Sequence, residues 1–400
     1  MGNSLSVDGC APIHMFTSSK AWIEGDATRQ LQQVACCDGV SAVAAMPDLH
    51  PGKFGPVGCA VLSQRVHPSL VGADIGCGMG LFALDLTARR IRPDKAAERL
   101  RALGGVWEGD ARVRLGSVGL DSTQFDPSLG TIGGGNHFCE LQAVDEIFDA
   151  DAAVAAGLDR DRAYVLVHSG SRGLGFSILD SFLATGEASL DPDSEAGSSY
   201  LASHDVAVRW AQLNRQVIAE RAAEALRADV VRLADLSHNF AERSGHGVLH
   251  RKGVAPSDRG LVPVPGSRGA LSYLMKPVGD VPGHSLASMA HGAGRKYERG
   301  AMHGRVGGKR SELERLARNP FGGLVVCEER NLLIEEAPEA YKSIGQVIDD
   351  LVAFGLATVV ATFRPLVTFK SVREDGRRHK RAKAHDRSEA RARKRGEDWR

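Results

Sequence analysis

Apolar residues along the chain follow two spacings, one typical of amphipathic helices and the other typical of buried strands. The helical spacing is clear over 206–228, where one face carries Val206, Trp210, Leu213 and Val217. Helices are also predicted over 27–34, 94–103 and 343–354. Apolar runs predict strands over 43–46, 59–62, 164–167 and 358–370. We interpret 71–75 as the end of another buried strand and 178–240 as largely helical.

The composition adds only broad limits. Of 400 residues, 43% are hydrophobic and 25% are charged, as in ordinary globular chains, and the length allows two or three domains or one large one. The longest apolar run is too short to predict a transmembrane helix. Seven cysteines form no CxxC pair and no dense framework, which favours a reducing cytoplasm over secretion.

One glycine-rich segment holds a carboxylate and a thiol three residues apart. Asp74 and Cys77 stand among four glycines between positions 72 and 80, which permit positive φ and a close approach to a ligand. An aspartate oxygen and a cysteine sulfur together suit a borderline cation such as Zn²⁺, Mn²⁺ or Co²⁺. A turn aspartate beside an inert buried cysteine is the alternative interpretation of this segment alone.

Three later segments each present a histidine among small or polar residues. His137 follows a Gly-Gly-Gly-Asn run and precedes Glu140 by three positions, so the two would share a face of a short helix or turn. His168 ends the strand predicted over 164–167 and opens a Ser-Gly-Ser-Arg-Gly run, which suits an anionic oxygen, most naturally phosphate. His238 follows an apolar run. If any one of these three histidines stood alone in the sequence, we would interpret it as structural.

Two further segments carry polar groups of open significance. Asp48, His50 and Lys53 share a Pro- and Gly-rich loop over 47–58, which is either a plain surface loop or a loop that contacts phosphate or a base near an active site. His246 and His250 are expected in a polar turn, where solvation alone would explain them.

His291 differs from the other histidines in its surroundings. Small residues flank it and leave room for a large group, and Arg295 could neutralise a phosphate there. No acidic residue stands between positions 285 and 297 to favour protonation of the imidazole. A neutral imidazole can attack phosphorus and form a covalent phosphoramidate, so we interpret His291 as a nucleophile. A loop histidine without a role is the alternative.

Taken together, these motifs resemble the RtcB family of RNA ligases over about residues 20–370. The resemblance rests on Pro-Asp-Leu-His-Pro-Gly-Lys (47–53), Asp-Ile-Gly-Cys-Gly (74–78), Gly-Gly-Asn-His-Phe-Cys-Glu (134–140), His-Ser-Gly-Ser-Arg-Gly (168–173), Ser-His-Asn (237–239), Arg-Lys-Gly (251–253), Pro-Gly-Ser-Arg-Gly (265–269) and His-Gly-Ala-Gly-Arg (291–295). The short length, together with Trp-Ile-Glu-Gly (22–25) and the motif at 47–53, resembles the branch coupled to release factor H. The resemblance implies a single α+β catalytic domain over 1–370, with mixed sheets and surrounding helices.

The resemblance also implies an activity. It points to a GTP- and Mn²⁺-dependent cytoplasmic ligase that joins an RNA 3′-phosphate, or a 2′,3′-cyclic phosphate opened to it, to a 5′-hydroxyl in RNA repair or tRNA splicing. The implied RNA is tRNA or ribosomal RNA, and the implied protein partner is release-factor-like. The residues that match the family's ligands of two manganese ions are Asp74, Cys77, His137, His168 and His238, with Cys77 bridging the two ions.

The same matching implies roles around the nucleotide. His291 matches the histidine that becomes guanylylated, although Ala290 precedes it where the family has serine. Nucleotide contacts fall at or near Asn136, His137, Phe138, Glu140, Asn239, Ser267, Gly292, Ala293, Gly294, Arg295, Tyr341 and Lys370. The chain continues about 30 residues past Lys370, and basic residues dominate this tail, 371–400. We expect the tail to be disordered or a solvated helix that contacts RNA or aids solubility.

Two other functions use the same residues. A two-metal phosphoesterase or nuclease would need the same ligands but not His291, because hydrolysis needs no such nucleophile. A catalytically silent RNA-binding factor held by the tail would need neither, and the complete ligand set argues against it.

Overall fold

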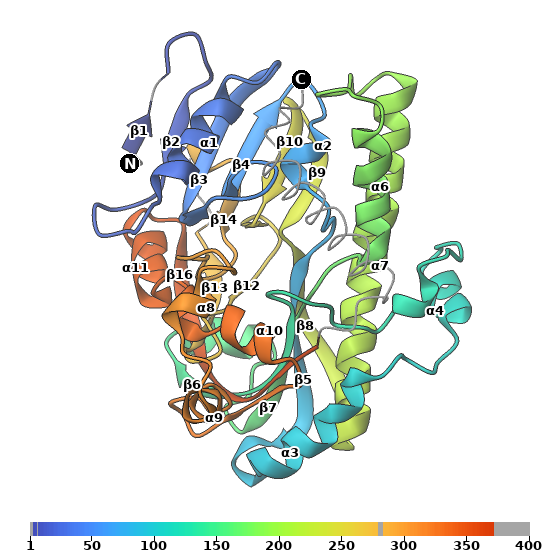
Figure 1. Cartoon of the computed structure of the whole chain (residues 1–400), viewed down its shortest axis with the longest axis vertical. Coiled ribbons are helices and arrows are strands. Elements are labelled where there is room, and N and C mark those ends of the chain that lie inside the picture. Colours follow the sequence, from blue (N-terminus) through green and yellow to red (C-terminus); the bar gives the residue numbers. More distant parts are fainter. Residues whose placement is uncertain (1–2, 6, 279–282, 372–400) are drawn as a thin grey trace, which may run out of the picture.

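Two large β-sheets form the frame of the molecule, which this computed structural model describes over residues 3–5, 7–278 and 283–371 (Figure 1). The six-stranded sheet runs, in spatial order, β1 (Asn3–Leu5), β2 (Ile13–Met15), β3 (Val40–His50), β4 (Val57–Ser63), β10 (Gly247–Lys252) and β9 (Asn239–Ser244). The eight-stranded sheet runs β12 (Val262–Val264), β13 (Ser272–Pro277), β16 (Ala357–Lys370), β6 (Phe138–Ile147), β7 (Arg162–Ser169), β5 (Gly78–Thr87) and β8 (Val230–Ser237), with β15 (Leu324–Cys327) parallel to β16. A separate pair joins β11 (Val254–Pro256) to β14 (Ser288–Ala290).

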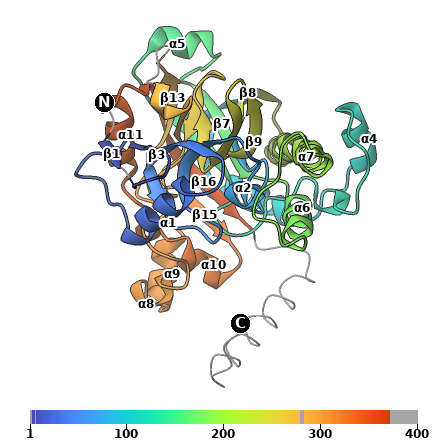
Figure 2. The same ribbon diagram turned by 90° about the horizontal axis from the view of Figure 1, so that it is seen from above.

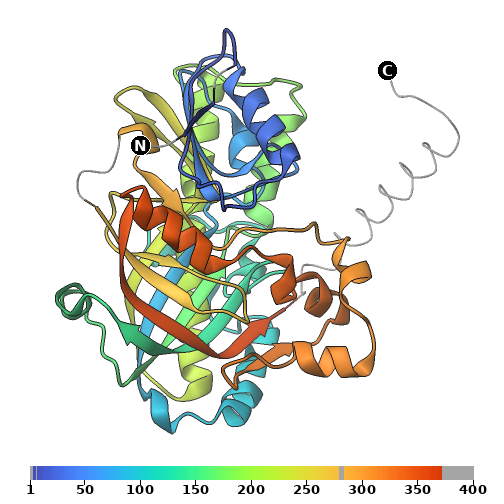
Figure 3. The same cartoon turned by 90° about the vertical axis from the view of Figure 1, so that its left-hand side faces the viewer.

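The larger sheet is nearly closed. Its end strand β12 also contacts β8 at the other end, so the sheet curls like a barrel, and Figure 3 shows the long strand β16 bending across it. Mixed sheets with surrounding helices confirm the expected α+β class. The expected tail lies outside the described residues from position 372 onward, and the domain boundary at 370 stays a prediction.

Helices lie around the two sheets. They are α1 (Gly25–Ala35), α2 (Pro68–Val71), α3 (Pro93–Leu100), α4 (Ala111–Ser117), α5 (Ala150–Ala155), α6 (Gly173–Leu183), α7 (Glu195–Leu226), α8 (Met302–Arg305), α9 (Arg310–Leu316), α10 (Arg330–Glu335) and α11 (Ile344–Ala353). The long helix α7 crosses β7, β5 and β8, and α6 lies beside it (Figure 2). Among the described residues, none of the helices combines the length and the apolar character that crossing a bilayer requires.

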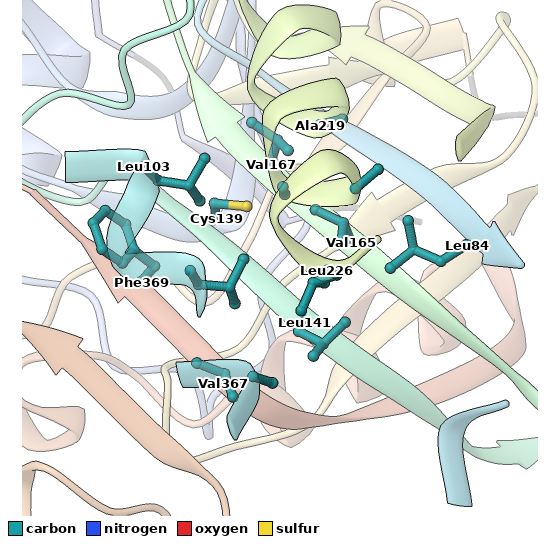
Figure 4. Close-up of a cluster of buried hydrophobic side chains, with 14 of the residues drawn as sticks. Leu84, Leu103, Cys139, Leu141, Val165, Val167, Ala219, Leu226, Val367 and Phe369 are labelled. Atoms are coloured by element: carbon teal, nitrogen blue, oxygen red, sulfur yellow. The ribbon is translucent and has the colours of Figure 1, made fainter. Parts of the chain in front are cut away.

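Strand β7 is buried on both faces and shows how the core is built. Ala163, Val165 and Val167 belong to the cluster under α7 and α3, part of which Figure 4 shows. Tyr164 and Leu166 alternate with them and belong to the cluster on the opposite face. This period of two explains why the strand reads as a continuous apolar run. It also places residue 168 on the same face as Tyr164 and Leu166.

Most of the predicted elements are confirmed and one is wrong, and the segment 178–240, predicted as largely helical, contains no helix after Leu226 because β8 and β9 follow. The strands predicted over 43–46, 59–62, 164–167 and 358–370 lie within β3, β4, β7 and β16, and the helices at 27–34, 206–228 and 343–354 correspond to α1, α7 and α11. Residues 71–75 are not a strand. Pro68 begins the short helix α2, where its fixed φ suits the first turn, and Gly72 ends it at φ 82°. Asp74 therefore lies in a turn rather than at a strand end.

The cysteine count alone did not indicate any covalent link. The structure pairs Cys10 with Cys36, the residue that ends α1. This disulfide ties the segment before β2 to the helix that packs on β3. Cys77 and Cys139 are free and buried.

The expectation of a solvated turn is right for His246 and wrong for His250. His246 is exposed between β9 and β10, whereas His250 lies inside β10 and is only 1% exposed. The backbone N–H of His67 donates to Nε2 of His250 at 2.9 Å, and Nδ1 lies 3.3 Å from the carbonyl oxygen of Val61. Burial, with a smaller contribution from His67, lowers the pKa of His250 to about 3.

This buried histidine predicts a loss of stability in acid. The unfolded chain binds a proton near pH 6.5 and the folded chain only near 3, so the stability contributed above 6.5 is lost as the pH falls through this window. When the pH falls from about 7.5 to 5.5, the free energy of unfolding of the wild type should therefore decrease by about 1.4 kcal/mol more than that of His250→Gln. Urea unfolding at both pH values measures this, with His246→Gln as the exposed control. Equal losses in wild type and His250→Gln would contradict it.

Candidate active site

Four candidate metal ligands come from one edge of the larger sheet. Cys77 precedes β5 and His137 precedes β6, whereas His168 lies near the end of β7 and His238 directly follows β8. Strand β7 is antiparallel to both β5 and β6, and β8 is antiparallel to β5, so these four strand ends meet. The register pairs His168 with Phe138, the residue after His137. Sheet topology thus gathers residues that are up to 161 positions apart (77 to 238).

Their side chains converge on one another and on Asp74. The sulfur of Cys77 lies 3.1 Å from Nε2 of His168 and 3.3 Å from Nε2 of His137. Nε2 of His168 lies 3.3 Å from Nε2 of His238, and Oδ2 of Asp74 lies 2.8 Å from Nε2 of His137. The five residues form two groups, each able to hold a cation, and Cys77 belongs to both groups.

The chemistry of these donors fits a divalent transition metal. Burial lowers the pKa of His168 and of His238 well below the ordinary value, so both imidazoles are neutral donors at neutral pH. Burial and the neighbouring Asp74 raise the pKa of the Cys77 thiol, so a bound cation would have to displace its proton. Mixed oxygen, nitrogen and sulfur donors favour a borderline ion such as Zn²⁺ or Mn²⁺.

Asp74 reaches this cluster because a glycine leaves it room. A Cβ on Gly170 would lie 2.0 Å from Oδ1 of Asp74, so no other residue fits there without a shift. Burial raises the pKa of Asp74, whereas the nearby His137 and Arg172 lower it by a larger amount. The pKa therefore lies below the ordinary value of an aspartate. Asp74 is therefore ionised at neutral pH, as a metal ligand would need to be.

A buried arginine that the sequence motifs did not indicate fixes the strand ends that carry the candidate ligands. Arg215 lies on α7 and is fully buried. Its guanidinium donates to the carbonyl oxygens of Gly76 at 2.7 Å and Ser169 at 3.0 Å and to Oγ of Ser237 at 3.3 Å. These three acceptors are the immediate neighbours of Cys77, His168 and His238. Its ion pair with Asp235, at 2.6 Å, offsets the burial of the charge.

His291 follows β14 and pairs with an acid from a different sheet. Its Nδ1 lies 2.7 Å from Oδ2 of Asp48, which is fully buried near the end of β3. The absence of nearby acids in the sequence was therefore misleading, because Asp48 is 243 positions away. The imidazole lies beside the five candidate metal ligands described above, which we call the metal-ligand cluster, and its ring centroid is 4.4 Å from that of His238. In the neutral tautomer with its proton on Nδ1, His291 would donate to this carboxylate and carry its lone pair on Nε2.

Two features hold Asp48 in place. Buried Lys342 donates through Nζ to the carbonyl oxygens of Pro47 and Leu49, on either side of it. Gly294, at φ 68°, passes so close that a Cβ there would lie 2.3 Å from the carbonyl oxygen of Asp48. The second glycine after His291 in the motif thus lets the segment that follows His291 pack against the backbone of Asp48. The segment 47–58 was predicted as a loop, but its first residues belong to strand β3, which ends at His50.

A cavity of about 730 Å³ adjoins His291 and the metal-ligand cluster. This volume is in the range of small-molecule sites. Every predicted nucleotide contact except His137 lines it, namely Asn136, Phe138, Glu140, Asn239, Ser267, Gly292, Ala293, Gly294, Arg295, Tyr341 and Lys370. His50 and Lys53 line it as well, which places the 47–58 segment at the site rather than on a plain surface.

The predicted relation between His137 and Glu140 is wrong. Residues 138–147 form strand β6, so these two side chains share no helical face. Glu140 is buried, with Oε1 2.7 Å from Nε2 of Gln142, and its other carboxylate oxygen accepts from the hydroxyl of Thr368. Burial raises its pKa, and these hydrogen bonds act against that rise.

A second residue missed by the sequence analysis, Glu336, organises the basic side of the cavity. Oε1 of this buried carboxylate lies 2.9 Å from Arg295 Nη1 and 3.1 Å from Arg299 Nε, and Oε2 accepts from the hydroxyl of Tyr341. Burial raises the pKa of Glu336, but Lys370 and the two arginines lower it to about 2. The guanidinium of Arg295 is engaged here, and its neutralisation of a phosphate stays a prediction. The only sequence signal is an acidic pair after an apolar run.

Comparison with known proteins agrees with this geometry. A family model described as tRNA-splicing ligase RtcB matches residues 30–104 and 108–371. The chain is 42% identical over 365 residues to RNA-splicing ligase RtcB2 of Escherichia coli, covering 90% of this chain and 96% of that protein. It is 30% identical over 431 residues to RNA-splicing ligase RtcB of Mycobacterium tuberculosis, covering 84% and 99%. The chain therefore belongs to the RtcB family of RNA ligases.

Proposed function

We propose that this chain is a GTP-dependent RNA ligase that joins a 3′-phosphate, or a 2′,3′-cyclic phosphate opened to it, to a 5′-hydroxyl through a guanylylated His291. The observation that carries the proposal is the pairing of His291 with Asp48 beside a Cys/His cluster in one cavity. A two-metal phosphoesterase would need the cluster but not an oriented imidazole with a free Nε2. The pairing therefore favours the ligase.

His291 would act first. Its Nε2 would attack the α-phosphorus of GTP, form an N–P bond and release pyrophosphate. Asp48 would hold the ring in the tautomer with a proton on Nδ1 and stabilise the positive charge that develops on the imidazole. An RNA 3′-phosphate oxygen would then attack the same phosphorus and break the N–P bond, which gives a guanylylated 3′ end. In the last step the 5′-hydroxyl attacks the RNA phosphorus, GMP leaves and the hydroxyl proton passes to solvent.

The residues that would hold two Mn²⁺ ions are Asp74, Cys77, His137, His168 and His238, with Cys77 shared. When bound, the ions would supply charge to offset that on the transferring phosphoryl groups. The other cavity residues would bind and orient the guanine nucleotide. The proposal extends to tRNA or ribosomal RNA as substrate and to a release-factor-like partner, which rests on the resemblance at residues 22–25 and 47–53.

The first prediction tests the nucleophile. His291→Ala should retain no label from radioactive GTP and should not seal RNA that carries a 3′-phosphate, because the N–P bond cannot form. It should still seal RNA supplied with a preformed 3′-guanylyl end, since the last step needs only metals and positioning. His246→Gln, which changes an exposed histidine outside the cavity, serves as the control. Label on the His291→Ala protein would refute the assignment.

The second prediction concerns Asp48. Asp48→Asn should lower the rate of adduct formation by about 10²- to 10⁴-fold, because a neutral amide neither stabilises the imidazolium nor fixes one tautomer. Quenched-flow sampling of the labelled adduct measures the rate, and nucleotide affinity should change little. A wild-type rate in Asp48→Asn would show that the pairing is only structural.

The third prediction concerns the metals. Cys77→Ala should lose manganese from both positions after dialysis, because one sulfur belongs to both ligand groups. Cys139→Ala is the matched control, since Cys139 is equally buried but packs in the apolar cluster under α7. Elemental analysis measures the content, and wild-type binding should also weaken in acid as the ligands protonate. Full occupancy in Cys77→Ala would exclude a shared thiolate.

A further inference from the structure

The mouth of the cavity beside His291 lies between two exposed segments. Among the described residues that line this cavity, the exposed ones are Lys53, Glu298, Arg299 and Gly300. The first belongs to 51–54, which follows β3, and the others form 298–300, shortly after the His291 motif. A ligand too large for the cavity would therefore extend outward between these two segments.

The segment 51–54 is held in place by α1. The side-chain amide of Gln30 donates to the carbonyl oxygen of Gly52 at 2.9 Å and accepts from the N–H of Gly52 at 3.0 Å. The next residue, Lys53, has its Nζ 5.1 Å from the centroid of the Phe54 ring. One side of the mouth thus carries a cation on a backbone that α1 fixes.

Beside the mouth lies a row of aromatic and cationic side chains, which we call the aromatic–cation row. It consists of Trp22, which precedes α1, of Lys296 and Tyr297, and of Arg305, which ends α8. Nζ of Lys296 lies 5.1 Å from the ring centroid of Trp22 and 5.3 Å from that of Tyr297. The guanidinium carbon of Arg305 lies 3.7 Å from the centroid of Tyr297. Since Lys296 and Tyr297 stand between Arg295 and Glu298, which both line the cavity, the row adjoins the mouth.

Trp22 is the member of this row that packing does not explain. The adjacent Ile23 packs against the apolar cluster of α1 and β3. Trp22 belongs to none of the apolar clusters of the described residues and is 53% exposed. A lone exposed tryptophan would need no explanation. Exposed rings beside cations, however, are typical of surfaces that bind single-stranded nucleic acid, because bases stack on the rings and phosphates pair with the cations.

The proposed reaction indicates which RNA strand passes this mouth. A 3′-phosphate oxygen has to reach the phosphorus of the guanylate on His291, so the 3′ end must enter the cavity that His291 lines. A volume of about 730 Å³ suits a small molecule, and the guanylate occupies part of it. The nucleotides that precede the 3′ end must therefore continue outward through the mouth.

We propose that the aromatic–cation row binds the RNA strand that carries the 3′-phosphate, with a base stacked on Trp22 and backbone phosphates near Lys53 and Lys296. This inference rests on the proposed ligase function and adds where the upstream part of that strand is held. A protein partner is the alternative occupant of an exposed tryptophan. The row favours RNA, because its rings suit unpaired bases and its cations suit phosphates.

The test follows the transfer of guanylate to this strand. The full chain is guanylylated with labelled GTP and Mn²⁺ and freed of GTP, and transfer of the label to a single-stranded RNA oligonucleotide with a 3′-phosphate is measured at increasing RNA concentrations. In Trp22→Ala, formation of the guanylyl adduct should match the wild type. The RNA concentration for half-maximal transfer should rise about 5- to 100-fold, the range expected for loss of one base–aromatic stack. With a dinucleotide 3′-phosphate, which is too short to reach the row, the two proteins should behave alike.

Three further variants complete the test. Trp22→Phe should restore most of the affinity for the oligonucleotide, because a smaller ring can still stack. Lys296→Gln should reduce the slope of log affinity against log salt concentration by about 0.7, as for one phosphate contact on a single strand. Phe148→Ala removes another exposed aromatic side chain, 56% accessible and outside the cavity, and should leave every step unchanged.

Three results would overturn the inference. The first is an unchanged half-maximal concentration in Trp22→Ala, which a protein-binding role of Trp22 would give. The second is an equal rise for the dinucleotide, which would show that the substitution distorts the cavity. The third is a rise confined to the 5′-hydroxyl strand in the sealing step. A wild-type chain that forms no guanylyl adduct would refute the proposed function, which is a separate outcome.

Discussion

One buried guanidinium holds the ligand-bearing strand ends together. Arg215 on α7 binds the backbone next to Cys77 and His168 and the hydroxyl next to His238, and Asp235 balances its charge. Removing one partner of such a buried pair typically destabilises a protein by about 3–5 kcal/mol, so the position of α7 on the sheet is strongly specified. The sheet provides adjacent strand ends, and Arg215 fixes their separation. The cluster depends on both.

The second determinant is the contact between the two sheets. Asp48 comes from the six-stranded sheet, whereas Cys77 and the three clustered histidines lie at strand ends of the larger one, and His291 follows β14 between them. Gly294 brings the His291 segment against β3. The proposed nucleophile, the acid that orients it and the candidate metal ligands thus belong to separate layers. The site exists only when all of these layers are packed together, which explains why the cavity beside His291 lies at their junction.

Sequence reasoning succeeded where the information was local. An apolar run ending in histidine located β7 and His168, and glycine runs located Asp74 and His137, because strand propensity and glycine freedom are properties of neighbouring residues. It failed where the partner was distant. Asp48 and His291 are 243 positions apart, and Arg215 lies on the side of α7 opposite the apolar face that the sequence indicated, where nothing local marked it as buried. The family's motifs indicated the site residues, but not the contacts that hold them.

The central claim is that His291, rather than one of the clustered histidines, forms the bond to guanylate. The most direct measurement is tandem mass spectrometry of the wild-type chain, incubated with GTP and Mn²⁺, digested at mildly alkaline pH and mapped peptide by peptide. The account predicts one GMP adduct per chain, located on His291. An adduct on His168, on His238 or on a lysine, or the absence of any adduct from chain loaded with manganese, would contradict it.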